Sequence, residues 1–371
     1  MTGQGAAIAH DWMVVEGGAE RVALEFARLL PSADVYTSFF DAETFGTRLA
    51  PNRVKPWLLQ RVPGASARFR SFLPFYPVYF GGLDLRRYRL VISSSIGFTH
   101  AVRTAAEATH ISYVYTPLRY AWDLDAYLDR SSFGLPARVG AQLIKPLLRR
   151  WDRSTADRPD VVVAISETIR GRIERLWNRE AEVVYPPVDV TEFEVSNTDD
   201  GYLLVAARML AYRRIDIAIE AANRLDRELV LVGDGPERQR LQAMAGRSVR
   251  FLGHLDRPAL VERIHRCHAY LVPGEEDFGI APVEAMAAGK PVVALGRGGA
   301  AETVVDGQTG VLYSQQSRDG LVAAIERLDG SAFDPAVIRA RAEQFAAPVF
   351  RERWRELFRR LGVDPSLYSA G

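Results

Sequence analysis

The sequence predicts an α/β protein made of two doubly wound domains, each with a parallel sheet. Three observations lead to this prediction. Short apolar, β-branched runs alternate with longer segments of helical periodicity. The short runs are apolar throughout, as in strands that are buried on both faces. The series stops once, near the middle of the chain, and then begins again.

The predicted strands fall into two groups. In the first half they are Ala6–His10, Val35–Ser38, Leu90–Ser93, His110–Val114, Val161–Ile165 and Val183–Tyr185. In the second half they are Tyr202–Ala206, Leu229–Val232, Arg250–Leu252, Ala269–Val272 and Pro291–Leu295. Between the groups lie two prolines in Tyr185–Asp189 and the polar stretch Glu194–Asp200. Proline lacks an amide donor and opposes helix, so this region is predicted to be a linker.

This organisation predicts an N-terminal domain over residues 1–190 and a C-terminal domain over residues 191–347. The final segment has a helical pattern over Pro348–Leu361, with its aromatic and leucine side chains on one side. That side must pack against something, and we expect the helix at 348–371 to return to the first domain. Open parallel sheets bind ligands at the carboxyl ends of their strands, which favours a nucleotide-like ligand in a cleft between two such domains.

The composition is that of an ordinary globular protein. The chain has 371 residues, a net charge of +1 and 48% hydrophobic residues. Its one cysteine, Cys267, excludes an internal disulfide and fits a reducing compartment. The N-terminus lacks the pattern of a signal peptide, and no apolar run approaches the ~18 residues of a spanning helix. We therefore expect a cytoplasmic protein that is not integral to a membrane.

The strongest chemical signal is the segment Pro273–Gly289, which follows a predicted strand. Pro282 suits the first turn of a helix and Gly289 suits its end. Glu276 is then expected in the loop before the helix, and Glu284 in its opening turn. A carboxylate is a strong acceptor for the two hydroxyls of a vicinal diol, and loop amides can bind further hydroxyls. The segment is thus suited to holding a sugar.

Glu276 and Glu284 are separated by seven residues, and the segment resembles the E-x7-E signature of family 4 retaining glycosyltransferases of the GT-B fold. Four other segments resemble motifs of that family in the same order: Gly17–Arg21, Arg208–Asp216, Leu231–Glu237 and Gly298–Gly310. The resemblance covers residues 6–330 approximately. It implies the GT-B fold, with two Rossmann-like domains whose parallel sheets face each other across a cleft. It also implies a retaining, metal-independent hexosyltransferase with no cofactor.

The resemblance assigns a role to each matching residue. Arg208 and Arg213 would stabilise the leaving diphosphate and Glu276 would orient the sugar, which makes these three the predicted catalytic residues. Arg213 stands where the family usually has lysine, so the charge is kept but the geometry becomes a planar fork. The predicted donor-binding residues are Gly17, Gly18, Glu284, Asp277, Phe278, Gly279, Ile280, Gly298 and Gly299. Glycines allow close backbone approach, and helix N-termini bind phosphate.

The segments His110–Asp123 and Tyr185–Asp189 resemble the branch of bacterial O-antigen and exopolysaccharide mannosyltransferases. That branch commonly has histidine where this chain has Tyr115, and tyrosine is a poor base near neutrality. His110 and His10 lie at or beside strand ends and could partly substitute. Tyr115, His110 and Arg119 are the candidate acceptor-side residues. The resemblance implies transfer of mannose from GDP-mannose to a polyprenyl-diphosphate-linked glycan.

The stretch from Arg53 to Arg103 carries nine basic residues and one acid, Asp84, and its part from Trp57 to Phe80 has seven interleaved aromatics. Arginine among aromatics suits an anionic bilayer surface, and it would also suit single-stranded nucleic acid or an acceptor-side wall. A lipid-linked acceptor would explain the charge and the aromatics together. We therefore expect a peripheral position on the inner face of the cytoplasmic membrane and no nucleic-acid partner.

Other functions remain open on the sequence. The donor could be a UDP-sugar or another GDP-sugar, because base contacts in this fold leave little trace. Tyr115 suggests a catalytically weak partner that binds a sugar nucleotide within a larger assembly. An epimerase of the same fold would need no acceptor. A dehydrogenase is disfavoured, since the G-x-G-x-x-G fingerprint is missing after the first strand.

Overall fold

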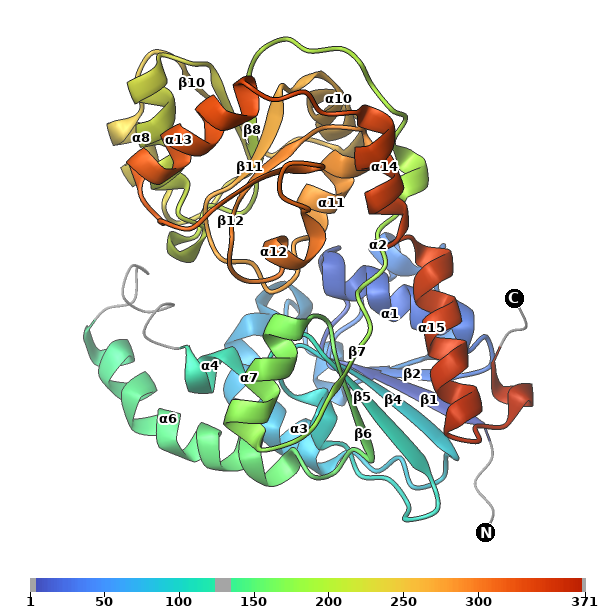
Figure 1. The fold of residues 1–371 in the computed structure, drawn as a ribbon. Helices are drawn as coiled ribbons and strands as arrows, with labels where there is room; N and C mark the ends of the chain where they lie inside the picture. Colours follow the sequence, from blue (N-terminus) through green and yellow to red (C-terminus); the bar gives the residue numbers. More distant parts are fainter. Residues whose placement is uncertain (1–4, 124–134, 369–371) are drawn as a thin grey trace. The chain divides into compact units, whose positions relative to one another are not determined.

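The computed structural model describes residues 5–123 and 135–368, with the side chains of residues 135–141 excepted. The chain forms two compact units, each built around one parallel sheet (Figure 1). Unit 1 contains the described residues up to 123, then 136–187, and then the C-terminal residues from 347. Unit 2 contains residues 188–346. Each unit is described by itself.

The sheet of unit 1 has seven strands in the order β3-β2-β1-β4-β5-β6-β7, and all neighbours are parallel. The strands are β1 (Ala6–His10), β2 (Asp34–Thr37), β3 (Val54–Pro56), β4 (Leu90–Ser95), β5 (Thr109–Val114), β6 (Val161–Ala164) and β7 (Glu182–Val183). The central strands β1, β4 and β5 are buried almost throughout. This burial explains their apolar sequences, since helices cover both faces of a parallel sheet.

The helices of unit 1 are α1 (Gly18–Leu29), α2 (Ala42–Phe45), α3 (Tyr76–Gly82), α4 (Arg119–Trp122), α6 (Leu135–Thr155), α7 (Glu167–Trp177) and α15 (Ala347–Arg360). A run of 3-10 turns, Ser66–Phe75, precedes α3. Some of the helices begin at a residue whose side chain caps the first turn. The hydroxyl of Ser166 accepts the N–H of Ile169 at 3.1 Å at the start of α7, which satisfies one of the free amides there.

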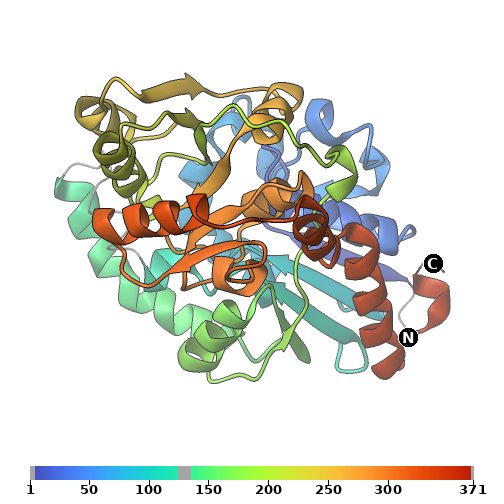
Figure 2. The same ribbon diagram turned by 45° about the horizontal axis from the view of Figure 1, so that its top comes forward.

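The C-terminal helix α15 returns to unit 1 and packs beside α1, as Figures 1 and 2 both show. Its Trp354 is fully buried. The indole lies edge-on to Phe26 of α1, with ring centres 4.7 Å apart, and its ring centre is 5.6 Å from that of Tyr113 on β5. Phe350 contacts Phe26 as well. These aromatic contacts join the end of the chain to the core formed near its beginning.

Unit 2 has six parallel strands in the order β10-β9-β8-β11-β12-β13. They are β8 (Leu203–Ala206), β9 (Leu229–Val232), β10 (Val249–Gly253), β11 (Ala269–Val272), β12 (Val292–Leu295) and β13 (Gly310–Tyr313). The helices are α8 (Ile215–Leu225), α9 (Arg238–Met244), α10 (Arg257–Arg266), α11 (Ile280–Ala287), α12 (Ala300–Thr303), α13 (Arg318–Asp329) and α14 (Pro335–Glu343). One apolar core lies between the sheet, α8 and α13.

The predicted fold of two Rossmann-like domains is confirmed, and every predicted strand overlaps an observed one. Two strands were not predicted. β3 is a three-residue edge strand that ends in proline, so it has no apolar run to recognise. β13 begins within the polar stretch Asp306–Gly310, which was interpreted only as a motif. Within the described ranges, no helix is both long enough and apolar enough to span a bilayer.

The packing of α15 leads to a stability prediction. Replacing Trp354 by alanine should lower the free energy of unfolding by about 3–5 kcal/mol, because a buried aromatic is lost and a cavity remains. Unfolding in urea, followed by circular dichroism, measures the change. The neighbouring exposed Arg353, which pairs with Glu356 at 3.2 Å, is the matched control. Its alanine variant should change stability by less than about 1 kcal/mol. Equal losses in the two variants would contradict this packing account.

Candidate functional site

Two neighbouring strands of unit 2 mark the place where a ligand is expected. β8 and β11 pair at the centre of the sheet, with β9 and β10 on one side and β12 and β13 on the other. The strand order therefore reverses between β8 and β11. In open parallel sheets, ligands bind at the carboxyl ends of the strands at this reversal. The loops that begin there are residues 207–214, after β8, and residues 273–279, after β11.

These two loops and the turn between β12 and α12 approach one another so closely that two positions require glycine. A Cβ atom on Gly274 would lie 2.5 Å from the carbonyl oxygen of Tyr212 and 2.7 Å from that of Arg213. A Cβ atom on Gly299 would overlap the backbone of Phe278. The N–H of Gly299 donates to the carbonyl oxygen of Glu276 at 2.7 Å. The glycine loop and the Glu276 loop are therefore one packed unit.

The Glu276 carboxylate forms an ion pair with Arg213. The Arg213 guanidinium also lies over the ring of Tyr212, 5.1 Å from its centre, and its Nε is buried without a hydrogen-bond partner among the described residues. Arg208 differs, because its side chain is exposed to solvent. Arg214 pairs with Asp216 at 3.1 Å beside them. Three arginines and the carboxylate of Glu276 thus lie in the loops at the carboxyl ends of β8 and β11.

Glu284 lies in the second turn of α11, and not in the opening turn as predicted, because the helix begins at Ile280 rather than at the proline. Its side chain is 7% exposed, and its Oε1 accepts a hydrogen bond from Nη2 of Arg257 at 2.8 Å. Arg257 also binds Glu192, with Nε 2.7 Å from Oε2, and its guanidinium lies over Phe193. The carboxylate is therefore held in one orientation by a cation that is itself fixed on three sides.

The segment between the two glutamates begins α11 through its backbone. Gly279 is the N-cap with φ of +91°, a conformation that favours glycine, and no side chain caps the first turn. Ile280 is the first helical residue and Asp277 is half-buried. The ring of Phe278 is buried and contacts Phe345, with ring centres 5.6 Å apart. A donor contact of Phe278 would therefore have to come from its backbone.

The predicted phosphate role of Gly298 and Gly299 rested on a helix that follows them. That helix, α12, has a single turn. Both glycines lie so close to the backbone of residues 276–278 that a side chain would not fit. The structure places them beside the Glu276 loop. Their residue type is explained by that contact without a ligand.

Gly17 and Gly18 begin α1 in unit 1, and the amide of Gly17 already has a partner. Gly17 is the N-cap, and the buried carboxylate of Glu20 accepts the backbone N–H groups of Gly17 and Glu20. This is the reciprocal half of a capping box. Burial raises the pKa of Glu20 to about 7. The local geometry therefore does not favour a phosphate on the amide of Gly17, since a carboxylate of the chain accepts it, and the role predicted for Gly18 stays a prediction.

Tyr115 directly follows β5, at the carboxyl edge of the unit 1 sheet. Its hydroxyl donates to the carbonyl oxygen of Ala19 at 3.1 Å and lies 2.9 Å from the Ser94 hydroxyl. Ser94 in turn lies 3.0 Å from Nδ1 of His10. The three side chains form one hydrogen-bonded line, and Nε2 of His10 is buried without a partner among the described residues. Arg119 begins α4 a few residues further on and is half-buried.

His110 lies beside a strand end, as expected, but this is the amino end of β5 and not the carboxyl edge where Tyr115 lies. It is the second residue of β5, four residues before the carboxyl end of that strand. The imidazole is fully buried, and its Nε2 lies 2.9 Å from the Ser93 hydroxyl. Burial lowers its pKa to about 3. His110 is therefore a neutral core residue.

Sequence reasoning missed three residues of these edges: Asp11, Glu20 and Arg257. Asp11 follows β1 directly and is fully buried. Its carboxylate accepts the N–H groups of Ile96 and Phe98 at 2.6 and 2.9 Å, while burial raises its pKa to about 7. An acid placed directly after the first strand is the signal that could have found it. Among residues 5–123 and 135–368, no three His, Cys, Asp or Glu side chains gather as a metal site requires.

Fewer aromatic side chains of the stretch Arg53–Arg103 lie on the surface than predicted. Phe69, Tyr76 and Phe80 are buried in the core of unit 1, and Trp57 packs against that core. Only Phe75 among the seven aromatics is exposed. The aromatics are therefore mainly structural, because the 3-10 turns and α3 fold back onto the sheet.

Burial of His110 leads to a pH prediction. Its folded pKa of about 3 lies below the unfolded value of 6.5, so protonation favours the unfolded state. The stabilising contribution is complete above pH 6.5 and falls by about 1.4 kcal/mol per pH unit as the pH drops toward 3. His110→Gln keeps a donor for Ser93 but does not titrate. Denaturation at pH 6.5 and 4.5 should show wild type losing about 2 kcal/mol more than this variant. Equal losses would contradict a neutral buried imidazole.

Comparison with known proteins agrees with this geometry. The model for Glycosyltransferase Family 4 matches residues 16–192, and that for glycosyl transferases group 1 matches residues 190–333. A glycogen synthase of Mycobacterium tuberculosis is 32% identical over 202 residues, 49% of this chain and 48% of that protein. A GDP-mannose-dependent alpha-mannosyltransferase of Mycolicibacterium smegmatis is 29% identical over 56% of each chain. The chain spans about half the length of the first of these relatives.

Solved structures share the fold at low identity. Anabaena HepE, crystallised in complex with UDP, has a TM-score of 0.70 and 18% identity, over 96% of this chain and all of that one. The lipopolysaccharide outer core galactosyltransferase WaaB has a TM-score of 0.66 and 16% identity, over 96% of this chain and 99% of that one. The two family models together span residues 16–333. The chain therefore belongs to the glycosyltransferases that join a Family 4 domain to a group 1 domain.

Proposed function

We propose that this protein is a retaining hexosyltransferase that uses a nucleotide sugar as donor. The observation that carries the proposal is the pair of carboxylates on the β11–α11 segment, each fixed by an arginine: Glu276 by Arg213 and Glu284 by Arg257. They lie at the strand reversal of unit 2, where open sheets bind ligands. Oriented acceptors beside exposed positive charge suit a ligand that has both hydroxyls and phosphates.

The chemistry needs stabilisation of a leaving group more than it needs a protein base. The bond from the anomeric carbon to the diphosphate breaks, and a bond to the acceptor oxygen forms on the same face. The proton of the acceptor hydroxyl passes to the departing diphosphate. Arg208 and Arg213 stabilise the charge that develops there, and no metal is needed for that task in this proposal. Glu276 orients the sugar hydroxyls and Glu284 binds the ribose diol.

The first candidate for the donor is GDP-mannose. Two relatives from Mycolicibacterium smegmatis support it, a phosphatidyl-myo-inositol mannosyltransferase and the GDP-mannose-dependent enzyme described above. A UDP-sugar is the alternative, since HepE was crystallised with UDP and with UDP-glucose. A catalytically weak sugar-nucleotide-binding partner is the second candidate function, favoured by the fully engaged hydroxyl of Tyr115.

For the acceptor we propose a polyprenyl-diphosphate-linked glycan, used in bacterial surface polysaccharide synthesis at the inner face of the cytoplasmic membrane. The excess of basic side chains in unit 1 supports an anionic, lipid-linked substrate. The burial of most interleaved aromatics in Arg53–Arg103 disfavours single-stranded nucleic acid, which would need exposed rings for stacking.

The donor is tested by thermal unfolding with GDP, UDP, GDP-mannose and UDP-sugars. A ligand that binds only the folded state raises the melting temperature according to its affinity. GDP compounds should stabilise the protein and UDP compounds should not. Glu284→Gln should weaken binding about tenfold or more, because a charge-assisted hydrogen bond is lost. Glu326→Gln, an exposed acid of α13 in the same unit, should bind like wild type.

Each other result has a clear meaning. Stabilisation by UDP compounds alone would overturn the donor and leave the transferase. Stabilisation without turnover of any donor would favour the catalytically weak partner. If no nucleotide stabilises the protein, or if Glu284→Gln binds as tightly as wild type, the assigned site is wrong.

A further inference from the structure

Helix α6 of unit 1 carries an apolar stripe that extends beyond the protein core. Side chains are described from residue 142 onward. At 100° per residue, the five large apolar side chains fall within an arc of about 140°. They are Leu143, Ile144, Leu147, Leu148 and Trp151. A stripe of this kind normally packs against another apolar surface along its whole length.

Among the described residues, only the C-terminal half of the stripe finds such a surface. Leu148 and Trp151 pack against the core of unit 1, and the Trp151 ring lies 5.9 Å from that of Phe98. The N-terminal half is uncovered, since Leu143 is 76% exposed and Leu147 is 68% exposed. Ile144 is exposed as well. One turn of α6 therefore carries neighbouring aliphatic side chains that no described residue covers.

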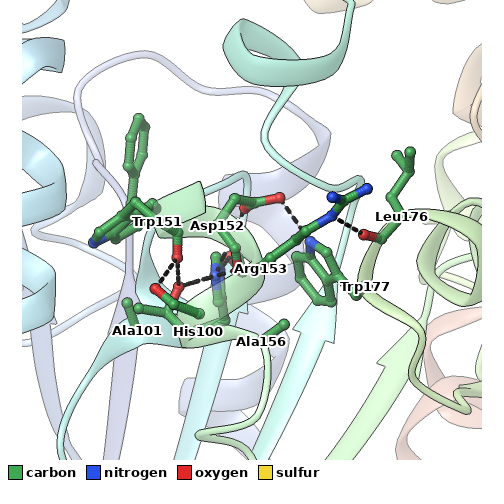
Figure 3. Close-up of polar contacts among 12 residues, drawn as sticks. His100, Ala101, Trp151, Asp152, Arg153, Ala156, Leu176 and Trp177 are labelled. Atoms are coloured by element: carbon green, nitrogen blue, oxygen red, sulfur yellow. Dashed lines mark hydrogen bonds and ion pairs between the residues drawn. The ribbon is translucent and has the colours of Figure 1, made fainter. Parts of the chain in front are cut away.

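The exposed turn is presented by a helix that is firmly attached. Asp152, on the inner side of α6, is buried and accepts the indole N–H groups of Trp122 at 2.7 Å and Trp177 at 2.6 Å. Figure 3 shows Asp152 between the neighbouring elements, with His100 and Trp177 beside it. The hydroxyl of Thr155 also lies 3.0 Å from Nε2 of His100. Such contacts fix the orientation of the helix relative to the sheet of unit 1.

The charges around the exposed turn have one sign. Between residues 142 and 155 the basic side chains are Lys145, Arg149, Arg150 and Arg153, and the only acid, Asp152, is buried. Arg149 and Arg153 lie over the ring of Trp122, 5.0 and 4.8 Å from its centre. Arg150 is exposed. Residues 142–155 thus form an aliphatic stripe flanked by cations with no exposed acid of their own, which is complementary to acyl chains below anionic headgroups.

A second stretch of unit 1 has the same character. Residues 58–78 contain four exposed apolar side chains, Leu58, Val62, Phe75 and Val78, with basic residues between them and no acid. Together with α6 this stretch accounts for seven of the eleven large apolar side chains that are exposed among the described residues. The uncovered apolar surface therefore belongs mainly to unit 1, and largely to segments without exposed acids.

Other partners fit the α6 turn less well. Nucleic acid would need aromatic rings for stacking, and the exposed side chains of the turn are aliphatic. A second copy, packed through the same face, would bring the cationic flanks of both copies together. Like charges in direct contact are unfavourable, whereas an anionic surface neutralises them.

We propose that residues 142–150 of α6 are a membrane-docking face, with Leu143, Ile144 and Leu147 inserted among lipid chains and Lys145 and Arg150 against anionic headgroups. The face extends the proposed function, in which the acceptor is lipid-linked. Because Asp152 fixes α6 to the sheet, docking orients unit 1 relative to the bilayer. The face consists of unit 1 residues and the proposed nucleotide-binding carboxylates are unit 2 residues, so vesicle binding and donor binding are measured separately.

The test is flotation of the whole protein with vesicles of phosphatidylcholine alone and of an equal mixture with phosphatidylglycerol. Wild type should bind the mixture and bind phosphatidylcholine weakly. Leu143→Ser/Leu147→Ser should weaken binding at least tenfold. The matched control, Val195→Ser/Val337→Ser, removes two exposed aliphatics of unit 2 and should bind like wild type. Lys145→Gln/Arg150→Gln should weaken binding about fivefold per charge at low salt, and less at high salt.

Three results would overturn the proposal: no binding of wild type to anionic vesicles, equal binding of the Leu143/Leu147 variant, or a solution dimer of wild type that this variant alone dissociates. Unchanged melting temperatures establish that the variants fold. If nucleotides stabilise the protein but vesicles do not bind, the docking face fails and the transferase stands. If vesicles bind and no nucleotide stabilises, the proposed function fails and the docking face stands.

Discussion

The candidate site depends on one constraint, which is that the carboxylates of Glu276 and Glu284 must be held in fixed orientations where little solvent reaches them. Leaving a carboxylate in such a place without a cation is costly, and a bound arginine removes most of that cost. Arg213 and Arg257 supply the cations for Glu276 and Glu284. Gly274 allows the loop that carries Glu276 to lie against the backbone of Arg213, and Gly299 allows the turn after β12 to lie against the backbone of Phe278. The site is therefore organised before any ligand arrives.

Much of this could be predicted from the sequence, because the signals were local. Continuous apolar runs such as Leu229–Val232 predict buried strands, and the Glu276–Glu284 spacing is a contiguous motif. Arg257 could not be predicted, since it reaches Glu284 from a separate helix and no pattern joins them. β3 was not predicted either, because a strand at the edge of a sheet does not need an apolar run.

Other predictions are not favoured by the packing around the residues concerned, because residue type did not reveal burial. Gly17 suggested a phosphate loop, yet the carboxylate of Glu20 accepts the backbone N–H of Gly17. His110 has the chemistry of a catalytic group but lies in the middle of the core. The aromatics near Arg68 looked like a surface and are mostly structural. In each case the neighbours of the residue in the folded chain determine its role. Those neighbours come from distant segments, and a local sequence pattern does not identify them.

The most direct test of the central claim is hydrogen–deuterium exchange with and without the nucleotide sugar that stabilises the protein best. Binding at the strand reversal should slow exchange in peptides covering residues 207–214, 273–284 and 298–301, because their amides and the loops that hold them become ordered around the ligand. The account predicts that protection within unit 2 is concentrated in these three segments. Protection confined to other parts of unit 2, or none at saturating ligand, would contradict it.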